Sequence, residues 1–260
     1  MFPHKDNLKC KIRNNYKSQK QFFESFDIDY YIPWHENNLS INNISHKDIS
    51  KKVSLFEEYL TEVEKANNTK RPVNMPPKWI TPQSKFRPTV LEEFCYYLLK
   101  DVPEIKKLSL EFKKKRVHAG FEIDSKGKIR QKRKDVDCAI VKAEEWTIGG
   151  KKLDLSLPVI CIECKTYLDG TMWNEAQYSA LLLKKVNSSA KIYVLAEENQ
   201  VDLSKITKES PVDDVFVLRN KETNKIAIDV VSEFVGEIQK NLQTVMSSNP
   251  IRIPGRLINY

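Results

Sequence analysis

The segment PVICIECKTYLDG, residues 158–170, carries a glutamate and a lysine two positions apart in an otherwise apolar run. In a strand, alternate residues share a face, so Cys161, Glu163 and Lys165 point one way and their neighbours point the other way. Burying a lone carboxylate or ammonium group costs free energy unless the charge is paired. We therefore expect the two charges to be satisfied by each other, by water in a cleft, or by a metal ion.

A second acidic group precedes this segment in KDVDCAIV, where Asp135 and Asp137 share a face before apolar residues take over. If the two strands are neighbours, Asp137 lies beside Glu163. Two adjacent carboxylates repel each other unless a cation lies between them, and oxygen-only ligands favour Mg²⁺. Lys165 would then face water at the metal, where its charge can stabilise hydroxide or a developing phosphorane, or where it can take a proton.

An acid followed two residues later by lysine is a common spacing in a chain with 30% charged residues. It occurs here at Glu104, Glu111, Asp124 and Glu163. Only Glu163 lies in an apolar predicted strand, and only Glu163 follows another predicted strand that has acidic residues at its polar beginning. The alternative interpretation is an ion pair on a solvent-facing edge strand. A zinc site at Cys161 and Cys164 is disfavoured because strand alternation sends the two sulfur atoms to opposite faces.

The elements around these residues predict an α/β domain over residues 81–260, with a mixed central β-sheet flanked by helices. A helix is expected around residues 88–100, where Leu91, Phe94, Cys95 and Leu98 share a face and Thr89 with Glu92 fits a capping box. Alternating patterns then predict strands at 116–123, 126–141 and 158–168. A helix at 171–185, two apolar strands and a final helix follow.

Residues 1–80 predict a helical lobe before the main domain. An Asn-rich patch at 36–50 is followed by Val53, Phe56, Leu60 and Val63 at helical spacing. The polar and proline-rich stretch at 67–79 then predicts a connector to the main domain.

The segment from Lys113 to Lys134 contains ten basic and two acidic residues, and this local excess equals the formal net charge of +8 of the whole chain. A localised basic stripe is typical of a protein that binds a polyanion, because phosphate contacts release counterions. The alternative is a solvated face of a lysine-rich protein. The alternating residues Lys126, Lys128, Arg130 and Lys132 predict a cationic strand face that leads to Asp137; other candidates for phosphate contact are Lys113, Lys115 and Arg116.

Asp137 in one predicted strand and the Glu163-Cys164-Lys165 triplet in the next resemble the motif of the PD-(D/E)XK nuclease superfamily, and the resemblance covers roughly residues 84–220. The sequence departs from the name of the superfamily at Val136, where proline is common. FRPTVLEEFCYYLLKD together with ECKTYLDGTMWNEA is most similar to type II restriction endonucleases, in particular a Bpu-type family. In the opening helix, Glu92 rather than Glu93 matches the acid of the superfamily pattern, with helix capping as the alternative role.

This resemblance implies Mg²⁺-dependent hydrolysis of DNA phosphodiesters, with 5′-phosphate and 3′-hydroxyl ends. Asp137 and Glu163 would hold the metal, and Lys165 would position or activate water. Gln177 on the following helix and His118 among the basic residues are further candidates, each with a solvent-facing position as the alternative. Cutting both strands of double-stranded DNA usually takes two sites, so a homodimer is expected, as is a cognate DNA methyltransferase in the same system. The helical lobe at residues 1–80 would then serve DNA binding or dimerisation.

No apolar run approaches the length of a membrane span, and the five cysteines are scattered through apolar segments. Both features favour a cytoplasmic protein with reduced thiols. Two rival functions stay open at this point. A repair or recombination nuclease of the same superfamily would share the site and recognise DNA structure, and a non-catalytic DNA-binding protein would explain the charge without Glu163 and Lys165.

Overall fold

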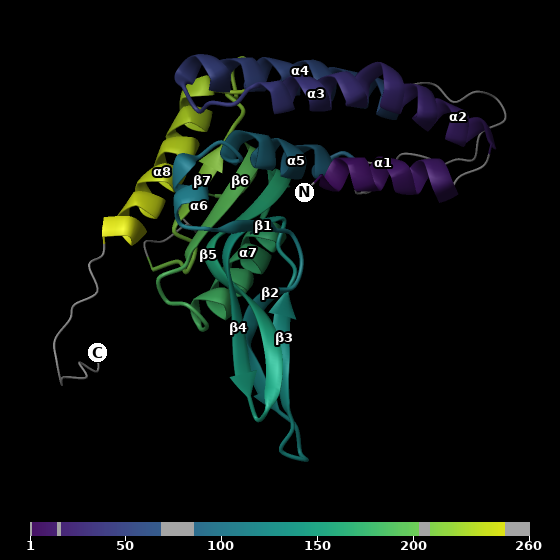
Figure 1. The fold of residues 1–260 in the computed structure, drawn as a ribbon. Coiled ribbons are helices and arrows are strands. Elements are labelled where there is room, and N and C mark those ends of the chain that lie inside the picture. The colour runs from purple at the N-terminus through teal and green to yellow at the C-terminus, as the bar shows by residue number, and fades with distance from the viewer. Residues whose placement is uncertain (1, 15–16, 69–85, 203–208, 248–260) are drawn as a thin grey trace.

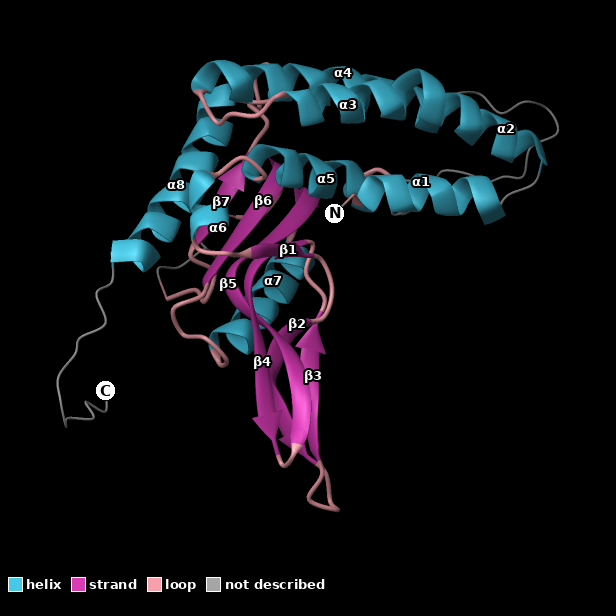
Figure 2. Ribbon diagram, viewed as in Figure 1, coloured by secondary structure: helices cyan, strands magenta, loops and turns pink. Residues whose placement is uncertain are grey.

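The computed structural model describes residues 2–14, 17–68, 86–202 and 209–247. Figures 1 and 2 show its helices and strands. The lobe elements are α1 (Pro3–Asn14), α2 (Lys17–Phe26), the π-helix η1 (Asp27–Tyr31), α3 (Ile32–Ser40) and α4 (His46–Asn68). The main domain then contains α5 (Pro88–Leu99), α6 (Pro103–Lys107), β1 (Glu111–Lys113), β2 (Val117–Ile123), β3 (Ile129–Lys134), β4 (Cys138–Ile148), β5 (Lys151–Leu168), α7 (Gly170–Lys184), β6 (Lys191–Asn199), β7 (Asp214–Val217) and α8 (Ile228–Ser247).

The central sheet has five strands in the order β1-β4-β5-β6-β7. The pairs β1–β4 and β4–β5 are antiparallel, whereas β5–β6 and β6–β7 are parallel. The change of direction occurs at β5, because a hairpin joins β4 to β5 and the crossover helix α7 joins β5 to β6. The mixed sheet flanked by helices that the sequence predicted is therefore confirmed.

Two apolar cores cover the two faces of this sheet. The lobe-side core joins Ile160, Ile162 and Cys164 of β5 to helices α5 and α8. The α7-side core contains Cys161 and the buried face of α7. The predicted alternation along β5 is confirmed, and it directs Glu163 and Lys165 to the α7 side with Cys161.

The predicted single strand at 126–141 is wrong. It is divided between β3, which pairs with β2 in a separate two-stranded sheet, and β4, which belongs to the central sheet. Between them the chain turns at 135–137, where Asp135 accepts a hydrogen bond from the backbone N–H of Arg116 at 3.0 Å and Val136 N–H donates to the carbonyl of Lys114 at 3.0 Å. Alternation continues through the turn, so the pattern alone hides the change of sheet.

Two smaller expectations also change. β5 begins at Lys151 rather than near Pro158, because the register of the β4–β5 pair shifts between Ile140 and Val141, beside Pro158. An irregularity of this kind tolerates a proline that has no N–H to donate. The capping box is wrong as well: Pro88 begins α5, and the hydroxyl of Thr89 donates to the carbonyl of Phe86.

Helix α5 lies between the helices of the lobe and the sheet (Figure 1). The lobe-side core is continuous from Leu8 of α1 through Phe56 of α4 and Phe94 of α5 to Phe234 of α8. The predicted boundary at residues 80 and 81 lies outside the described residues, and the role of the lobe stays a prediction.

All five cysteines lie in described segments, and none of them forms a disulfide. Within the described segments, no helix is both long and apolar enough to cross a membrane.

Candidate active site

The register of β4 and β5 brings the two predicted acids together. Cys138, the first residue of β4, pairs with Ile162 of β5 in the antiparallel ladder. One step further along the ladder, Asp137 stands opposite Glu163, and directly opposed residues share a face. The two strands are therefore neighbours, as the sequence predicted.

Lys165 lies between the two carboxylates. Its Nζ is 3.2 Å from Oε2 of Glu163 and 3.9 Å from Oδ2 of Asp137. Asp137 Oδ2 also accepts a hydrogen bond at 2.9 Å from the backbone N–H of Cys164. The exposed fractions of the three side chains are 24% for Asp137, 10% for Glu163 and 18% for Lys165, so all three are accessible from one side and shielded on the other.

The electrostatics of this cluster are unbalanced. Burial raises the pKa of Glu163, the charge of Asp137 raises it further, and Lys165 offsets only part of the effect. Burial alone would lower the pKa of Lys165, but the charges of Glu163 and Asp137 outweigh it and raise that pKa. The site thus holds a firmly protonated lysine and more negative charge than the lysine compensates.

A cleft of about 320 Å³ opens beside these residues. Side chains and backbone from five parts of the chain line it: Pro88 and Glu92 of α5; Lys114 and Lys115 after β1; Asp135, Val136 and Asp137 before β4; Cys164, Lys165 and Thr166 of β5; and Met172 of α7. A larger cleft of about 450 Å³, lined by Trp34 and Tyr59, lies in the helical lobe. The chemistry of the lining residues, rather than the volume, identifies the smaller cleft as the candidate site.

Glu92 reaches this cleft from α5 and forms an ion pair with Lys114. Glu92 is 8% exposed and lies within the helix rather than at its cap. Lys114 was not among the candidates picked from the sequence. Its position in the basic run was visible, but its partner lies 22 residues away in another element, and local spacing carries no signal for that pairing.

The other basic candidates lie in two places. Lys115 lines the cleft, Lys113 forms an ion pair with Glu111 at 3.3 Å, and Arg116 has a left-handed backbone with φ of 64°. Lys113 ends β1, and Lys115 and Arg116 lie in the short connection from β1 to β2. The hydrogen bonds of that connection to residues 135 and 136 hold it next to Asp137.

Only two of the four residues in the predicted cationic strand face, Arg130 and Lys132, lie on a strand. Lys126 and Lys128 lie in the turn between β2 and β3, where their N–H groups donate to the carboxylate of Asp124. Arg130 and Lys132 lie on β3 and are exposed, with ion pairs to Asp124 at 3.1 Å and Glu122 at 3.3 Å. The strand β3 runs from this turn back toward α5 (Figure 2), the helix whose Glu92 lines the cleft.

The structure does not bring His118 or Gln177 into the cleft lining. His118 lies on β2, is 2% exposed, and has its ring nitrogen 3.1 Å from the side-chain amide of Gln131. Gln177 is partly exposed on α7. Neither the phosphate contact nor the surface position expected for His118 fits this burial.

The oxygen atoms of Asp137 and Glu163 fit a hard divalent cation such as Mg²⁺. Such a cation would offset the repulsion between the two carboxylates, which adds to burial in raising the pKa of Glu163. Among the described residues, no three His, Cys, Asp or Glu side chains gather as a complete metal cage. Magnesium sites commonly use one or two carboxylates and complete the shell with water and substrate phosphate.

Comparisons with known proteins identify a family and a fold. A family model described as Bpu10I restriction endonuclease matches residues 83–242. Among solved structures, the chain is similar to one described as the native BbvCI A2B2 tetramer at low resolution, with a TM-score of 0.72 and 15% sequence identity. That match covers 95% of this chain and 97% of the other, and at this identity it shows the fold. No curated protein matches the chain.

Proposed function

The chain belongs to the Bpu10I restriction endonuclease family, and from this premise we propose that it is a type II enzyme that hydrolyses double-stranded DNA with Mg²⁺. The products would carry 5′-phosphate and 3′-hydroxyl ends. The observation that carries the proposal is the cluster of Asp137, Glu163 and Lys165, of which Asp137 and Lys165 line the cleft together with Glu92 of α5, while Glu163 lies behind them against Lys165.

The residues divide the chemistry among them. Asp137 and Glu163 would hold Mg²⁺, which when bound supplies Lewis acidity and neutralises phosphate charge. In the metal-free cleft the charges of Glu163 and Asp137 raise the pKa of Lys165, so its ammonium group is available to stabilise developing negative charge. Mg²⁺ on the two carboxylates would weaken this effect on the pKa, and proton abstraction stays the alternative role. Lys165 would also orient the attacking water. That water would attack phosphorus in line and expel the 3′ oxygen of the neighbouring nucleotide.

Glu92 and the basic residues at the rim would position the substrate. Lys115 lines the cleft near Asp137, and its neighbours in the chain, Lys113 and Arg116, would contact a phosphate backbone that passes there. Arg130, Lys132 and the turn lysines Lys126 and Lys128 would extend this contact along β3. Such contacts fix the position of the duplex and carry no direct sequence information.

We further propose that two copies of this chain act together as a homodimer, because one cleft can attack one strand at a time. The BbvCI protein forms an A2B2 assembly, so a complex with a second kind of chain is the alternative. A cognate DNA methyltransferase would protect the host sequence.

Digestion of a sequenced plasmid tests the proposal. In Mg²⁺ the protein should give discrete fragments, and ligation followed by sequencing of the ends should locate one recognition sequence with 5′-phosphates. Without divalent cations the plasmid should stay intact. Nicks that follow DNA structure rather than sequence would support a repair nuclease, and retained DNA binding without cleavage under all conditions would support a non-catalytic binder.

The basic strand gives a separate prediction. Replacing Arg130 and Lys132 together by alanine should weaken DNA binding and reduce the slope of log K against log salt concentration by about 2, or about 1 for each lost phosphate contact. Fluorescence anisotropy with a labelled duplex at several salt concentrations measures this slope. Lys65→Ala with Lys240→Ala is a matched control, because both are exposed and paired with Glu62 and Glu237 on lobe and C-terminal helices. A wild-type slope in the Arg130 and Lys132 variant would rule out the β3 contact.

A further inference from the structure

Glu93 follows Glu92 on α5 and is buried against the N-terminal lobe, with no exposed surface. Its carboxylate accepts four hydrogen bonds. Oε2 accepts from the backbone N–H groups of His4 at 2.9 Å and Lys5 at 3.2 Å. Oε1 accepts from the hydroxyl groups of Tyr31 at 2.7 Å and Tyr97 at 2.6 Å.

These four donors fix the carboxylate in one orientation. His4 and Lys5 lie in the first turn of α1, whose N–H groups have no partner within their own helix. A carboxylate there satisfies them and also interacts favourably with the helix dipole. Burial would raise the pKa of Glu93, but the nearby ring of His35, with Nδ1 3.8 Å from Oε1, and the hydrogen bonds from Tyr97 and Tyr31 outweigh burial and lower that pKa, so the group stays ionised.

His4 adds a second link between the lobe and α5. Its Nδ1 lies 3.0 Å from the hydroxyl of Thr89 on α5, and its Nε2 lies 2.7 Å from the hydroxyl of Tyr59 on α4. The Thr89 hydroxyl donates to Phe86, so Nδ1–H donates to Thr89 and Nε2 accepts from Tyr59. Burial lowers the pKa of His4 to about 4, which agrees with a neutral ring.

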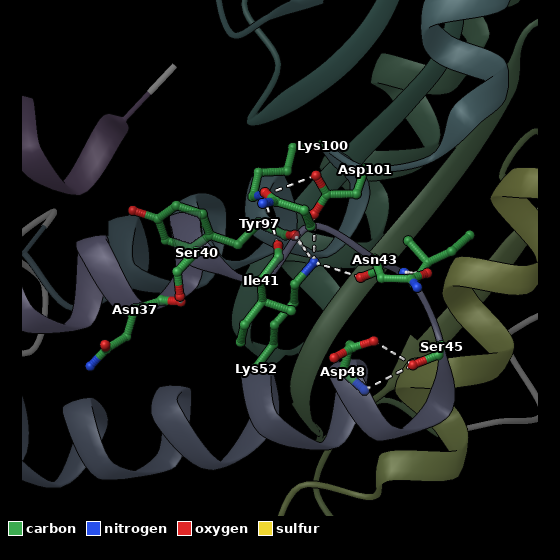
Figure 3. Close-up of polar contacts among 12 residues, drawn as sticks. Asn37, Ser40, Ile41, Asn43, Ser45, Asp48, Lys52, Tyr97, Lys100 and Asp101 are labelled. Carbon is green, nitrogen blue, oxygen red and sulfur yellow. Dashed lines mark hydrogen bonds and ion pairs between the residues drawn. The ribbon is translucent and has the colours of Figure 1, made fainter.

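The other end of α5 is held by charge as well (Figure 3). Lys52 of α4 is fully buried, and its Nζ donates to the carbonyl of Tyr97 at 2.8 Å and to Asp101 at 3.0 Å. Lys100 Nζ donates to Asp101 and to the carbonyl of Ile41. The lobe therefore contacts α5 through directional polar bonds at both ends of the helix.

Consecutive residues of an α-helix point about 100° apart around its axis. Glu93 in its lobe pocket and Glu92 in the cleft are consecutive, so the rotation of α5 that satisfies one also sets the direction of the other. An apolar residue could fill the position of Glu93 at a lower desolvation cost, but it would not select one rotation. Burying this polar network costs desolvation free energy but selects one rotation of α5, as a positioning role requires.

We propose that Glu93 is a positioning residue of the nuclease: held by the N-terminal lobe, it sets the rotation of α5 that directs Glu92 into the cleft beside Lys114. The lobe is then part of the catalytic unit, whatever else it binds. This inference rests on the proposed function for the consequence in cleavage, but the placement of Glu92 against Lys114 can be tested without cleavage.

Glu93→Gln is the sharpest variant. Its amide oxygen can still accept from the two tyrosines, but the NH₂ group then faces the N–H groups of His4 and Lys5, and donors oppose donors. Tyr31→Phe is the milder second variant, because it removes one donor and keeps the ring. Glu104→Gln is the matched control: Glu104 is also a buried helical glutamate that accepts side-chain hydrogen bonds, from Gln239 and Gln243 of α8.

The first readout is the reactivity of Lys114 toward an acylating reagent, measured by mass spectrometry on the folded full-length chain. Glu92→Gln gives the reference for a Lys114 that has lost its carboxylate partner. We expect labelling of Lys114 in Glu93→Gln to rise to near that reference, in Tyr31→Phe to rise partway, and in Glu104→Gln to stay at the wild-type level. Wild-type labelling in both Glu93→Gln and Tyr31→Phe would overturn the proposal, even if the protein never cleaves DNA.

The second readout is cleavage, if the wild type cleaves. Glu93→Gln should lower kcat about 10- to 100-fold with KM little changed, in line with the sensitivity of reactions to misplaced groups. In the Glu92→Gln background the same change should have no further effect on kcat, because its target is gone. An equal loss of kcat in both backgrounds would mean general loosening and would overturn the positioning role. Absence of cleavage by the wild type would instead contradict the proposed function, while the labelling result stands by itself.

Discussion

Replacing Lys165 by alanine is expected to lower DNA cleavage by about 100- to 1000-fold, the loss typical for removal of one group that stabilises developing charge. The ammonium group lies within 3.2 Å of Glu163 and 3.9 Å of Asp137, at the point where the attacked phosphate would lie. DNA binding should persist, because the basic residues at the rim and on β3 are untouched. Single-turnover cleavage and fluorescence anisotropy measure the two effects separately.

Lys184→Ala serves as the matched control for this variant. Lys184 is a partly buried lysine with an ion pair to Asp213 at 2.7 Å, on the far end of α7. The Lys184→Ala variant should cleave DNA at the wild-type rate. If Lys165→Ala cut DNA as fast as Lys184→Ala, the lysine would be a structural ion-pair partner only, and the non-catalytic interpretation would gain.

The second large effect concerns the acids. Asp137→Asn should reduce divalent-cation affinity at least about 10-fold, because a neutral amide replaces one of two anionic oxygen ligands. The same substitution should leave stability without metal unchanged or raise it by about 1 kcal/mol, since it removes a carboxylate that repels Glu163 while an amide oxygen can still accept from Cys164 N–H. Calorimetric titration with Mg²⁺ and thermal denaturation in chelator measure these two quantities.

A loss of metal affinity without a loss of stability distinguishes a metal-binding carboxylate from a structural one. A structural carboxylate loses stability when it is replaced, as Asp213→Asn should, because Asp213 accepts from Lys184, Lys191 and the N–H of Ile192. A clear loss of stability in Asp137→Asn with unchanged metal affinity would show that Asp137 serves the fold rather than a cation.

Much of the site could be predicted because it is encoded in short-range alternation. Glu163 and Lys165 lie two residues apart on one strand, and strand geometry alone sends them to one face. Asp137 heads the preceding strand of the same hairpin, and antiparallel pairing of consecutive strands is the simplest connection. The apolar helix at α7 and the buried strand β6 also have strong local patterns.

What could not be predicted depends on partners far away in the sequence. The alternating pattern through residues 126–141 does not show that β3 pairs with β2 while β4 pairs with β5. The Lys114–Glu92 ion pair joins a loop to a helix, and Glu93 meets His4 across 89 positions. Spacing reveals which face a residue is on, but the identity of the element that covers that face is set by tertiary packing.

Diffraction from crystals soaked in Mn²⁺, with anomalous differences collected at the manganese edge, tests the central claim most directly. The account predicts one strong anomalous peak within coordination distance of the carboxylates of Asp137 and Glu163, and its loss in Asp137→Asn crystals. A peak elsewhere in the molecule, with no peak beside these two carboxylates, would contradict it.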